Sequence, residues 1–115
     1  MTADLLSAPP TDGSARPLLL ITDLRAGRIA VTGELDRGSA HHLLDALETL
    51  TLSDQRTWTV DAAGITFCDA EGLRVLAQAR SVAQSRGRVL VLDRPSRFLV
   101  RMLGLVGMDR WSTGR

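Results

Sequence analysis

The stretch GITFCDAEGLRVLAQAR, residues 64–80, decides the fold class of this chain. Its beginning is apolar and favours the end of a buried strand, and Asp69 stands where a tight turn must lead into a helix. A carboxylate at that position can cap the helix by accepting hydrogen bonds from its first free amides. Apolar residues then recur at helical spacing, among them Val75, Leu76 and Ala79. The stretch therefore predicts a strand, a tight turn and an amphipathic helix in immediate succession.

Upstream of this stretch the pattern predicts a hairpin followed by a helix. Two apolar runs, Leu18–Ile21 and Arg28–Thr32, flank a turn-forming segment and favour an antiparallel pair of strands. Apolar residues then follow helical spacing through residues 39–50. Either Ser39 or Asp36 can cap this helix, because both side chains accept hydrogen bonds from backbone amides.

The remaining elements continue the alternation of strands and helices. We expect a short strand at 57–64 that leads to Gly64, the central helix, a strand at 88–93, a helix at 96–106 and a final short strand from Met108 to Trp111. Strands that alternate with amphipathic helices form a sheet with those helices packed against it. The sequence thus predicts an α/β fold with a mixed sheet of four to five strands and helices on one face.

Length and composition indicate one globular domain. Residues 1–16 are rich in Pro, Ser, Ala and Thr and are expected to form a flexible tail, which leaves 17–115 as a single domain. A formal net charge of +1 gives no general attraction to nucleic acid. No segment reaches the roughly 20 apolar residues that a membrane span needs. The N-terminus lacks the layout of a signal peptide, so we expect a cytoplasmic protein.

The sequence offers few residues for catalysis or metal binding. Cys68 is the only cysteine, which excludes an internal disulfide and fits a reducing compartment. His41 and His42 are adjacent, so on a helix they should point too far apart to share one metal ion. We therefore expect no cofactor, no metal and no enzyme activity. A small thiol enzyme that uses Cys68 is the alternative from another class.

Three motifs resemble those of one family. VTGELD at 31–36, VDAAGITFCDAEGL at 60–73 and LGLVGMDRW at 103–111 stand in the order and spacing found in the STAS domain of bacterial anti-sigma-factor antagonists. The resemblance covers about residues 18–112. It implies a STAS fold and a non-catalytic protein whose partner is an anti-sigma factor of the kinase type.

The resemblance also exposes a departure from the family pattern at Ala70. In the family, the residue after the motif's Asp is usually a Ser or Thr that a partner kinase phosphorylates, and phosphorylation breaks the complex. Alanine cannot accept phosphate, so one interpretation is a protein that always stays competent to bind. The other is that Glu71 imitates the phosphate. We favour the first, because Glu71 is offset by about 100° around the helix and carries less charge than a phosphate. Thr66 is the nearest upstream hydroxyl that regulation could use instead.

The resemblance implies a docking surface made from two loops. It joins the end of GELD to the start of the central helix, and its candidate residues are Glu34, Asp36, Asp69, Ala70, Glu71, Gly72 and Arg74. Other roles known for STAS domains are an accessory subunit of a transport ATPase and a scaffold in a signalling assembly. The chain stops short of the extra terminal helix of many members, which could expose apolar surface and favour a homodimer.

Overall fold

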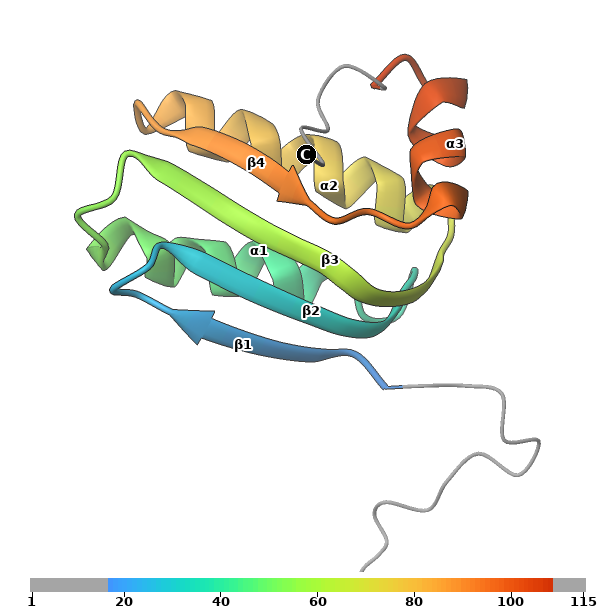
Figure 1. Ribbon diagram of the computed structural model, residues 1–115, viewed down its shortest axis with the longest axis horizontal. Coiled ribbons are helices and arrows are strands. Elements are labelled where there is room, and N and C mark those ends of the chain that lie inside the picture. The colour runs from blue at the N-terminus through green and yellow to red at the C-terminus, as the bar shows by residue number, and fades with distance from the viewer. Residues whose placement is uncertain (1–16, 109–115) are drawn as a thin grey trace, which may run out of the picture.

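The computed structural model describes residues 17–108, and in this range the predicted order of elements is confirmed (Figure 1). The elements are β1 (Leu19–Asp23), β2 (Arg28–Leu35), α1 (His41–Thr49), the short 3-10 helix η1 (Leu50–Leu52), β3 (Thr57–Cys68), α2 (Ala70–Ser85), β4 (Val89–Asp93) and α3 (Arg97–Leu105). Within the described residues, no helix combines the length and the apolarity that crossing a bilayer requires.

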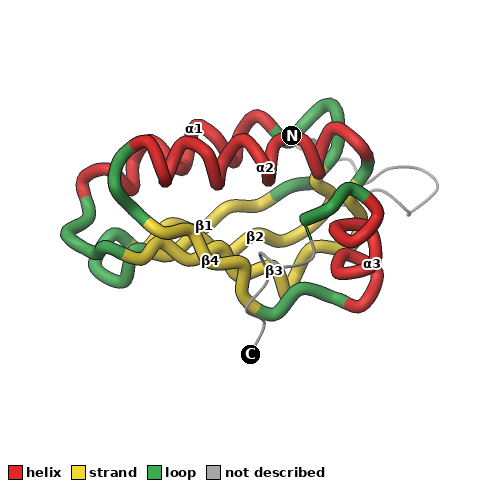
Figure 2. Tube along the Cα trace, turned by 90° about the horizontal axis from the view of Figure 1, so that it is seen from above, coloured by secondary structure: helices red, strands yellow, loops and turns green. Residues whose placement is uncertain are grey.

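The strands form one mixed sheet in the order β1-β2-β3-β4. β1 pairs antiparallel with β2, whereas β2 with β3 and β3 with β4 are parallel pairs. Figure 2 shows α1 and α2 side by side over one face of this sheet, while α3 lies at its end. The expectation that the helices cover one face is therefore confirmed for α1 and α2, and α3 departs from it. The opposite face is not covered by a described helix.

The core lies between the sheet and the two covering helices. Its largest fully buried side chain is Trp58 of β3. Alternate residues of the strands point into this layer, as the pleat of a sheet requires. They meet the apolar stripes of the helices, and the fully buried members include Ile29, Val31, Leu35, Leu43, Leu47, Val60, Leu76, Leu92, Leu99 and Leu103.

β3 continues past Gly64 to Cys68, so the strand expected at 57–64 and the strand end expected in GITFC form one element, and the glycine does not end it. Gly64 instead allows close approach to β2. A Cβ atom at this position would lie 2.8 Å from the Thr32 Oγ1 and 2.9 Å from the Val31 carbonyl oxygen. The pairing register of the two strands also shifts between Ala30 and Thr32. A glycine inside a strand commonly marks such an irregularity rather than an end.

Two further expectations need adjustment at the ends of elements. β2 continues past Thr32 to Leu35. The final strand expected from Met108 to Trp111 lies outside the described residues, except for Met108, which is not in a strand.

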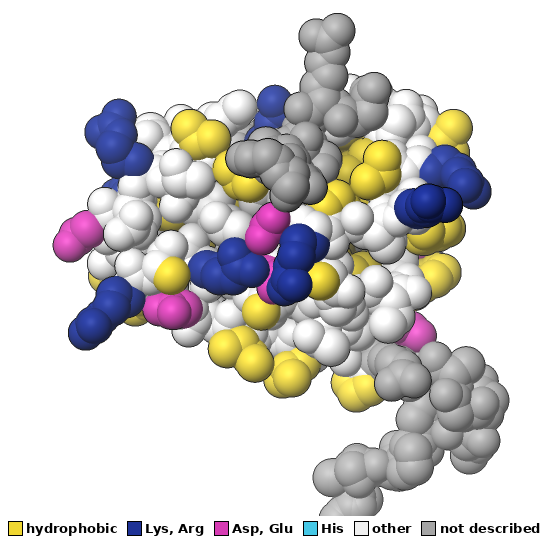
Figure 3. Space-filling view, viewed as in Figure 1, with side chains coloured by type: hydrophobic (Ala, Val, Ile, Leu, Met, Phe, Trp, Pro, Cys, Tyr) yellow, Lys and Arg dark blue, Asp and Glu magenta, His cyan; other side chains and the backbone are white. Residues whose placement is uncertain are grey.

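An ion-pair cluster joins three strands on the uncovered face of the sheet. The carboxylate of Asp61, in β3, forms ion pairs with the guanidinium groups of Arg94 at 2.6 Å and of Arg28 at 2.9 Å. The guanidinium group of Arg28 also lies 3.4 Å from the Asp93 carboxylate. Figure 3 shows basic and acidic side chains gathered at the centre of this face. Burial alone would raise the pKa of Asp61, but hydrogen bonds from Arg94, the Ala63 amide and Arg28 outweigh it and hold the pKa below its ordinary value.

Replacing Asp61 with asparagine is expected to lower the free energy of unfolding by about 1 kcal/mol at neutral pH. The value is modest because Arg94 and Arg28 are partly exposed to solvent, which screens the attraction. A lowered pKa in the folded state stabilises the protein above the ordinary value of about 3.9, and this contribution disappears as the pH falls through the folded value. Urea denaturation should therefore separate wild type from Asp61→Asn at neutral pH and bring them together in acid. Asp54→Asn, at an exposed carboxylate, is the control.

Candidate protein-docking surface

The candidate surface lies where the carboxyl ends of β2 and β3 meet the start of α2. Because β2 and β3 are parallel, they end at the same edge of the sheet, with Leu35 paired to Cys68. The Asp69 amide donates to the Leu35 carbonyl oxygen at 3.4 Å, and the Arg37 amide donates to the Asp69 Oδ2 at 3.1 Å. The loop after β2 and the first turn of α2 therefore lie side by side, although they are separated by more than 30 residues in the sequence.

Asp69 caps α2, as the sequence predicts. Its Oδ1 accepts a hydrogen bond from the Gly72 amide at 2.8 Å, while its Oδ2 accepts from the Arg37 amide. Both oxygens therefore bind backbone amides, one in the helix and one in the neighbouring loop. This carboxylate fixes the position of the loop relative to the helix, so its direct role is structural.

Gly72 permits the first turn of α2 to press against the strand ends. A Cβ atom on this residue would lie 2.2 Å from the Leu35 carbonyl oxygen and 2.8 Å from the Cys68 Sγ. Contacts of that length do not occur between real atoms of these types, so only glycine fits here without movement of the backbone. The structure therefore explains Gly72 by its contact with the end of β2.

Ala70 is the first residue of α2 and is exposed. On one side it borders an open apolar groove of about 240 Å³ that is lined by Ala70, Leu73, Arg74, Ala77, Val106 and Met108. On the other side it borders a shallow polar depression formed with Arg37, Asp69 and Glu71. A side chain at position 70 therefore stands between an apolar and a charged area of the surface.

The charge of Glu71 is paired within the helix. Arg74 donates to Glu71 through both Nε, at 3.0 Å, and Nη2, and it also donates to the Gln78 side chain at 3.0 Å. The hydrogen bond from Arg74 and its positive charge hold the pKa of Glu71 below its ordinary value. A carboxylate already paired with an arginine is a poor imitation of a phosphate, which carries nearly two charges. Arg74, a candidate docking residue, is exposed and forms its ion pair within α2.

The GELD loop, defined as residues 34–39, is closed into a turn by hydrogen bonds between its own residues. The prediction that Ser39 or Asp36 caps α1 is wrong. The helix begins after Ala40 without a side-chain cap. Ser39 Oγ donates to the Glu34 carbonyl oxygen at 2.8 Å, and Asp36 Oδ1 accepts from the Gly38 amide at 3.1 Å. Both side chains are used in the turn that comes before the helix. Asp36 and Glu34 are half-buried at the edge of the surface around Ala70.

Thr66 and Cys68 are two other reactive side chains near the end of β3. Thr66 is exposed within β3, two residues before the strand ends. Cys68 is buried, and burial together with the neighbouring Asp69 charge raises the pKa of its thiol to about 12. A nucleophilic cysteine needs the thiolate form at neutral pH, which a raised pKa opposes. The environment of Cys68 therefore argues against a thiol enzyme.

The expectation that His41 and His42 point too far apart to share one metal ion is not met in α1. The rings of His41 and His42 lie 4.0 Å apart between centroids, and one donor atom from each of them and from Asp45 lie within 4.8 Å of one another. Asp45 is three residues from one histidine and four from the other, which places it on the same helix face as both. Two imidazoles and a carboxylate could hold a divalent transition metal. All three are exposed at a helix N-terminus, whose partial positive charge opposes a cation.

Sequence reasoning missed Val106 and Met108, which line the apolar groove, and Arg37, which lines the polar depression. Val106 and Met108 approach Ala70 only because α3 folds back beside α2. No local pattern in the sequence predicts that contact. Arg37 could have been identified, because it directly follows GELD and precedes a glycine in an expected loop.

Comparisons with known proteins give a family and a fold. A family model described as "Mlab, STAS domain" matches residues 20–113. The solved structure of the anti-sigma factor antagonist SpoIIAA in its unphosphorylated form superimposes with a TM-score of 0.65 and 14% sequence identity, over 84% of this chain and 85% of that one. At such low identity the likeness supports the fold alone. No curated protein matches significantly.

Proposed function

Because this chain belongs to the STAS domain family, we propose that it is a non-catalytic regulator that binds a kinase-type anti-sigma factor through the surface around Ala70. The partner docks on the GELD loop and on the first turn of α2, which the Asp69 carboxylate holds together. Binding of the partner would free the sigma factor. This role implies a bacterial protein that acts in the cytoplasm.

The observation that carries the proposal is the exposed methyl group at position 70. It lies at the centre of the candidate surface, at the place where the resemblance implies a phosphorylated hydroxyl. The adjacent groove is apolar and can receive an apolar side chain of a partner, which is how a few well-packed anchors supply most of the affinity of an interface. Since alanine cannot be phosphorylated, the surface stays competent to bind at all times.

A second candidate is an accessory subunit of a transport ATPase. The matching family model is described as Mlab and not as an anti-sigma-factor antagonist, which keeps open this other binding role that the resemblance implies. The same surface would then dock on the ATPase. The two candidates differ in the partner rather than in the residues of this chain.

A homodimer would use a different part of the molecule. The uncovered face of the sheet carries the exposed side chains Leu19, Ile21 and Val89 around the ion-pair cluster. Apolar side chains around a polar centre can form a self-complementary interface. Sedimentation of the purified chain over a range of concentrations would test for this dimer.

The experiment that tests the proposal is capture of the partner from a lysate of the source cells, followed by identification through mass spectrometry. We expect a small protein with a histidine-kinase-type ATPase domain. Hydrogen exchange on the purified complex should then show protection at residues 34–38 and 69–74. Recovery of a membrane ATPase would favour the second candidate. A partner that protects neither segment would contradict the assignment of the surface.

A further inference from the structure

α3 carries apolar side chains on its outward face as well as on its buried one. Leu99 and Leu103 are buried against the core, yet Phe98, Val100 and Leu105 are 46%, 40% and 78% exposed. Isolated exposed apolar residues are common on protein surfaces. Phe98 and Leu105 are seven residues apart, which places them on one face of the helix, and neighbouring exposed apolar side chains commonly mark interaction sites.

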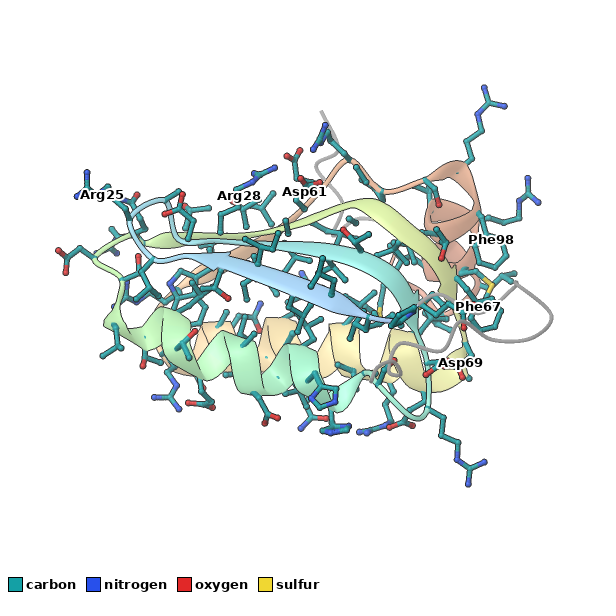
Figure 4. The ribbon with its side chains drawn as sticks, turned by 90° about the horizontal axis from the view of Figure 1, so that it is seen from below. Arg25, Arg28, Asp61, Phe67, Asp69 and Phe98 are labelled. Atoms are coloured by element: carbon teal, nitrogen blue, oxygen red, sulfur yellow. The ribbon has the colours of Figure 1, made fainter. Side chains whose placement is uncertain are left out.

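Phe67 adds a second exposed aromatic side chain at the same end of the molecule. It is 43% exposed near the end of β3, and Figure 4 shows it projecting beside Phe98, with Asp69 nearby and Arg25 at the opposite end. Aromatic side chains are enriched among the residues that dominate binding energy at protein interfaces.

The same face of α3 carries two arginines that form no ion pair with any other residue of the described range 17–108. Arg97 and Arg101 are exposed, and among residues 17–108 neither guanidinium forms an ion pair. Arg97 is the first residue of α3, where the helix dipole disfavours a positive charge, and the first turn contains no acidic residue. A residue that opposes its local structure without internal compensation is a signature of function.

The arginines and the apolar side chains share one surface. Arg97, Val100, Arg101 and Leu105 follow the spacing of three and four residues that places side chains on one face of a helix. Arginine and aromatic residues together are the composition of interface cores. We propose that this α3 surface, defined as Phe67, Arg97, Phe98, Val100, Arg101 and Leu105, docks an acidic segment of a partner protein that also presents apolar side chains.

Charge complementarity determines the chemistry of this occupant. The arginines attract carboxylates, while the apolar side chains between them need an apolar counterpart. The surface also adjoins the groove beside Ala70, since Val106 and Met108 follow directly after α3 and line that groove. The α3 surface therefore adds a second contact area to the interface proposed at Ala70. The preference of the α3 surface for an acidic segment does not depend on which protein docks at Ala70.

The test uses two synthetic amphipathic peptides that share leucine and phenylalanine positions and differ only in charge, one with glutamate and one with lysine. Fluorescence anisotropy should detect binding of the acidic peptide, and added salt should weaken it because exposed charges are screened. Phe98→Ala should weaken binding by at least about tenfold. Arg101→Glu should weaken it by about threefold to tenfold. Arg25→Glu is the matched control at the opposite end and should have no effect.

Several results would overturn the proposal. They are equal binding of the two peptides, no binding of the acidic peptide, and a loss of peptide affinity in Arg25→Glu as large as in Arg101→Glu. Tighter binding of the protein to anionic vesicles or to single-stranded DNA than to the acidic peptide would also overturn it. Thermal unfolding of each variant shows whether the fold is retained. Peptide binding reports on the α3 surface alone, whereas capture of the partner reports on the surface around Ala70, so a failure of the function proposed for Ala70 can be told apart from a failure of the α3 surface.

Discussion

Replacing Gly72 with alanine is expected to lower the free energy of unfolding by about 3 kcal/mol or more, on the scale of severe overpacking in a core. The added methyl group would have to occupy space 2.2 Å from the Leu35 carbonyl oxygen. That oxygen belongs to a strand in the centre of the sheet and cannot move aside as a flexible side chain could. In a helix without such a neighbour, the same substitution stabilises by about 1 kcal/mol. The sign of the effect therefore reports the close approach directly.

Chemical denaturation of wild type and Gly72→Ala would measure this loss, and the melting temperature should fall by about 12 °C or more. Gly38→Ala is the matched control, because a Cβ atom there would have the Asp36 Oδ1 as its nearest neighbour, at an ordinary 3.8 Å. An equal stability of Gly72→Ala and wild type would show that the first turn of α2 does not press against β2 as described.

Replacing Ala70 with glutamate is expected to weaken partner binding by about a hundredfold. The variant places a carboxylate between the apolar groove and the polar depression, where Arg74 is already paired with Glu71. An unpaired charge enclosed in an interface costs several kcal/mol, and each 1.4 kcal/mol changes the affinity tenfold. Stability should change little, because residue 70 is exposed in the free protein.

Isothermal titration with the identified partner would measure the effect of Ala70→Glu. Ala26→Glu makes the same chemical change at an exposed alanine in the turn between β1 and β2, at the opposite end of the molecule. It should bind as wild type does. If both variants bind equally well, the interface does not include residue 70.

The sequence predicts most of the fold because its signals are local. The cap at Asp69 and the stripe of Val75, Leu76 and Ala79 each depend on residues within a few positions of one another. The close contact of Gly64 with β2 was not predicted, because it depends on the pairing of two strands that are distant in the sequence. The ion-pair cluster around Asp61 was not predicted, because it depends on the register of three strands.

The candidate site was predicted in its outline but not in its contacts. The motifs place Asp36 and Asp69 on neighbouring loops, and the structure brings these loops together. The turn closed by Ser39 was read as a helix cap, since both uses require the same residue types. The pair of Glu71 and Arg74 stands at helical spacing and was readable from the sequence. The groove depends on the return of α3 toward α2, which no local signal contains.

The most direct test of the account is the affinity of the complex before and after incubation with the kinase-type partner and ATP. Wild type should acquire no phosphate on residue 70 and should bind equally well in both states. Ala70→Ser should bind like wild type at first, then gain a phosphate of nearly two negative charges and lose the partner. A wild-type complex that dissociates after incubation with ATP, with phosphate on Thr66 or another residue, would contradict the claim that this surface escapes control by phosphorylation.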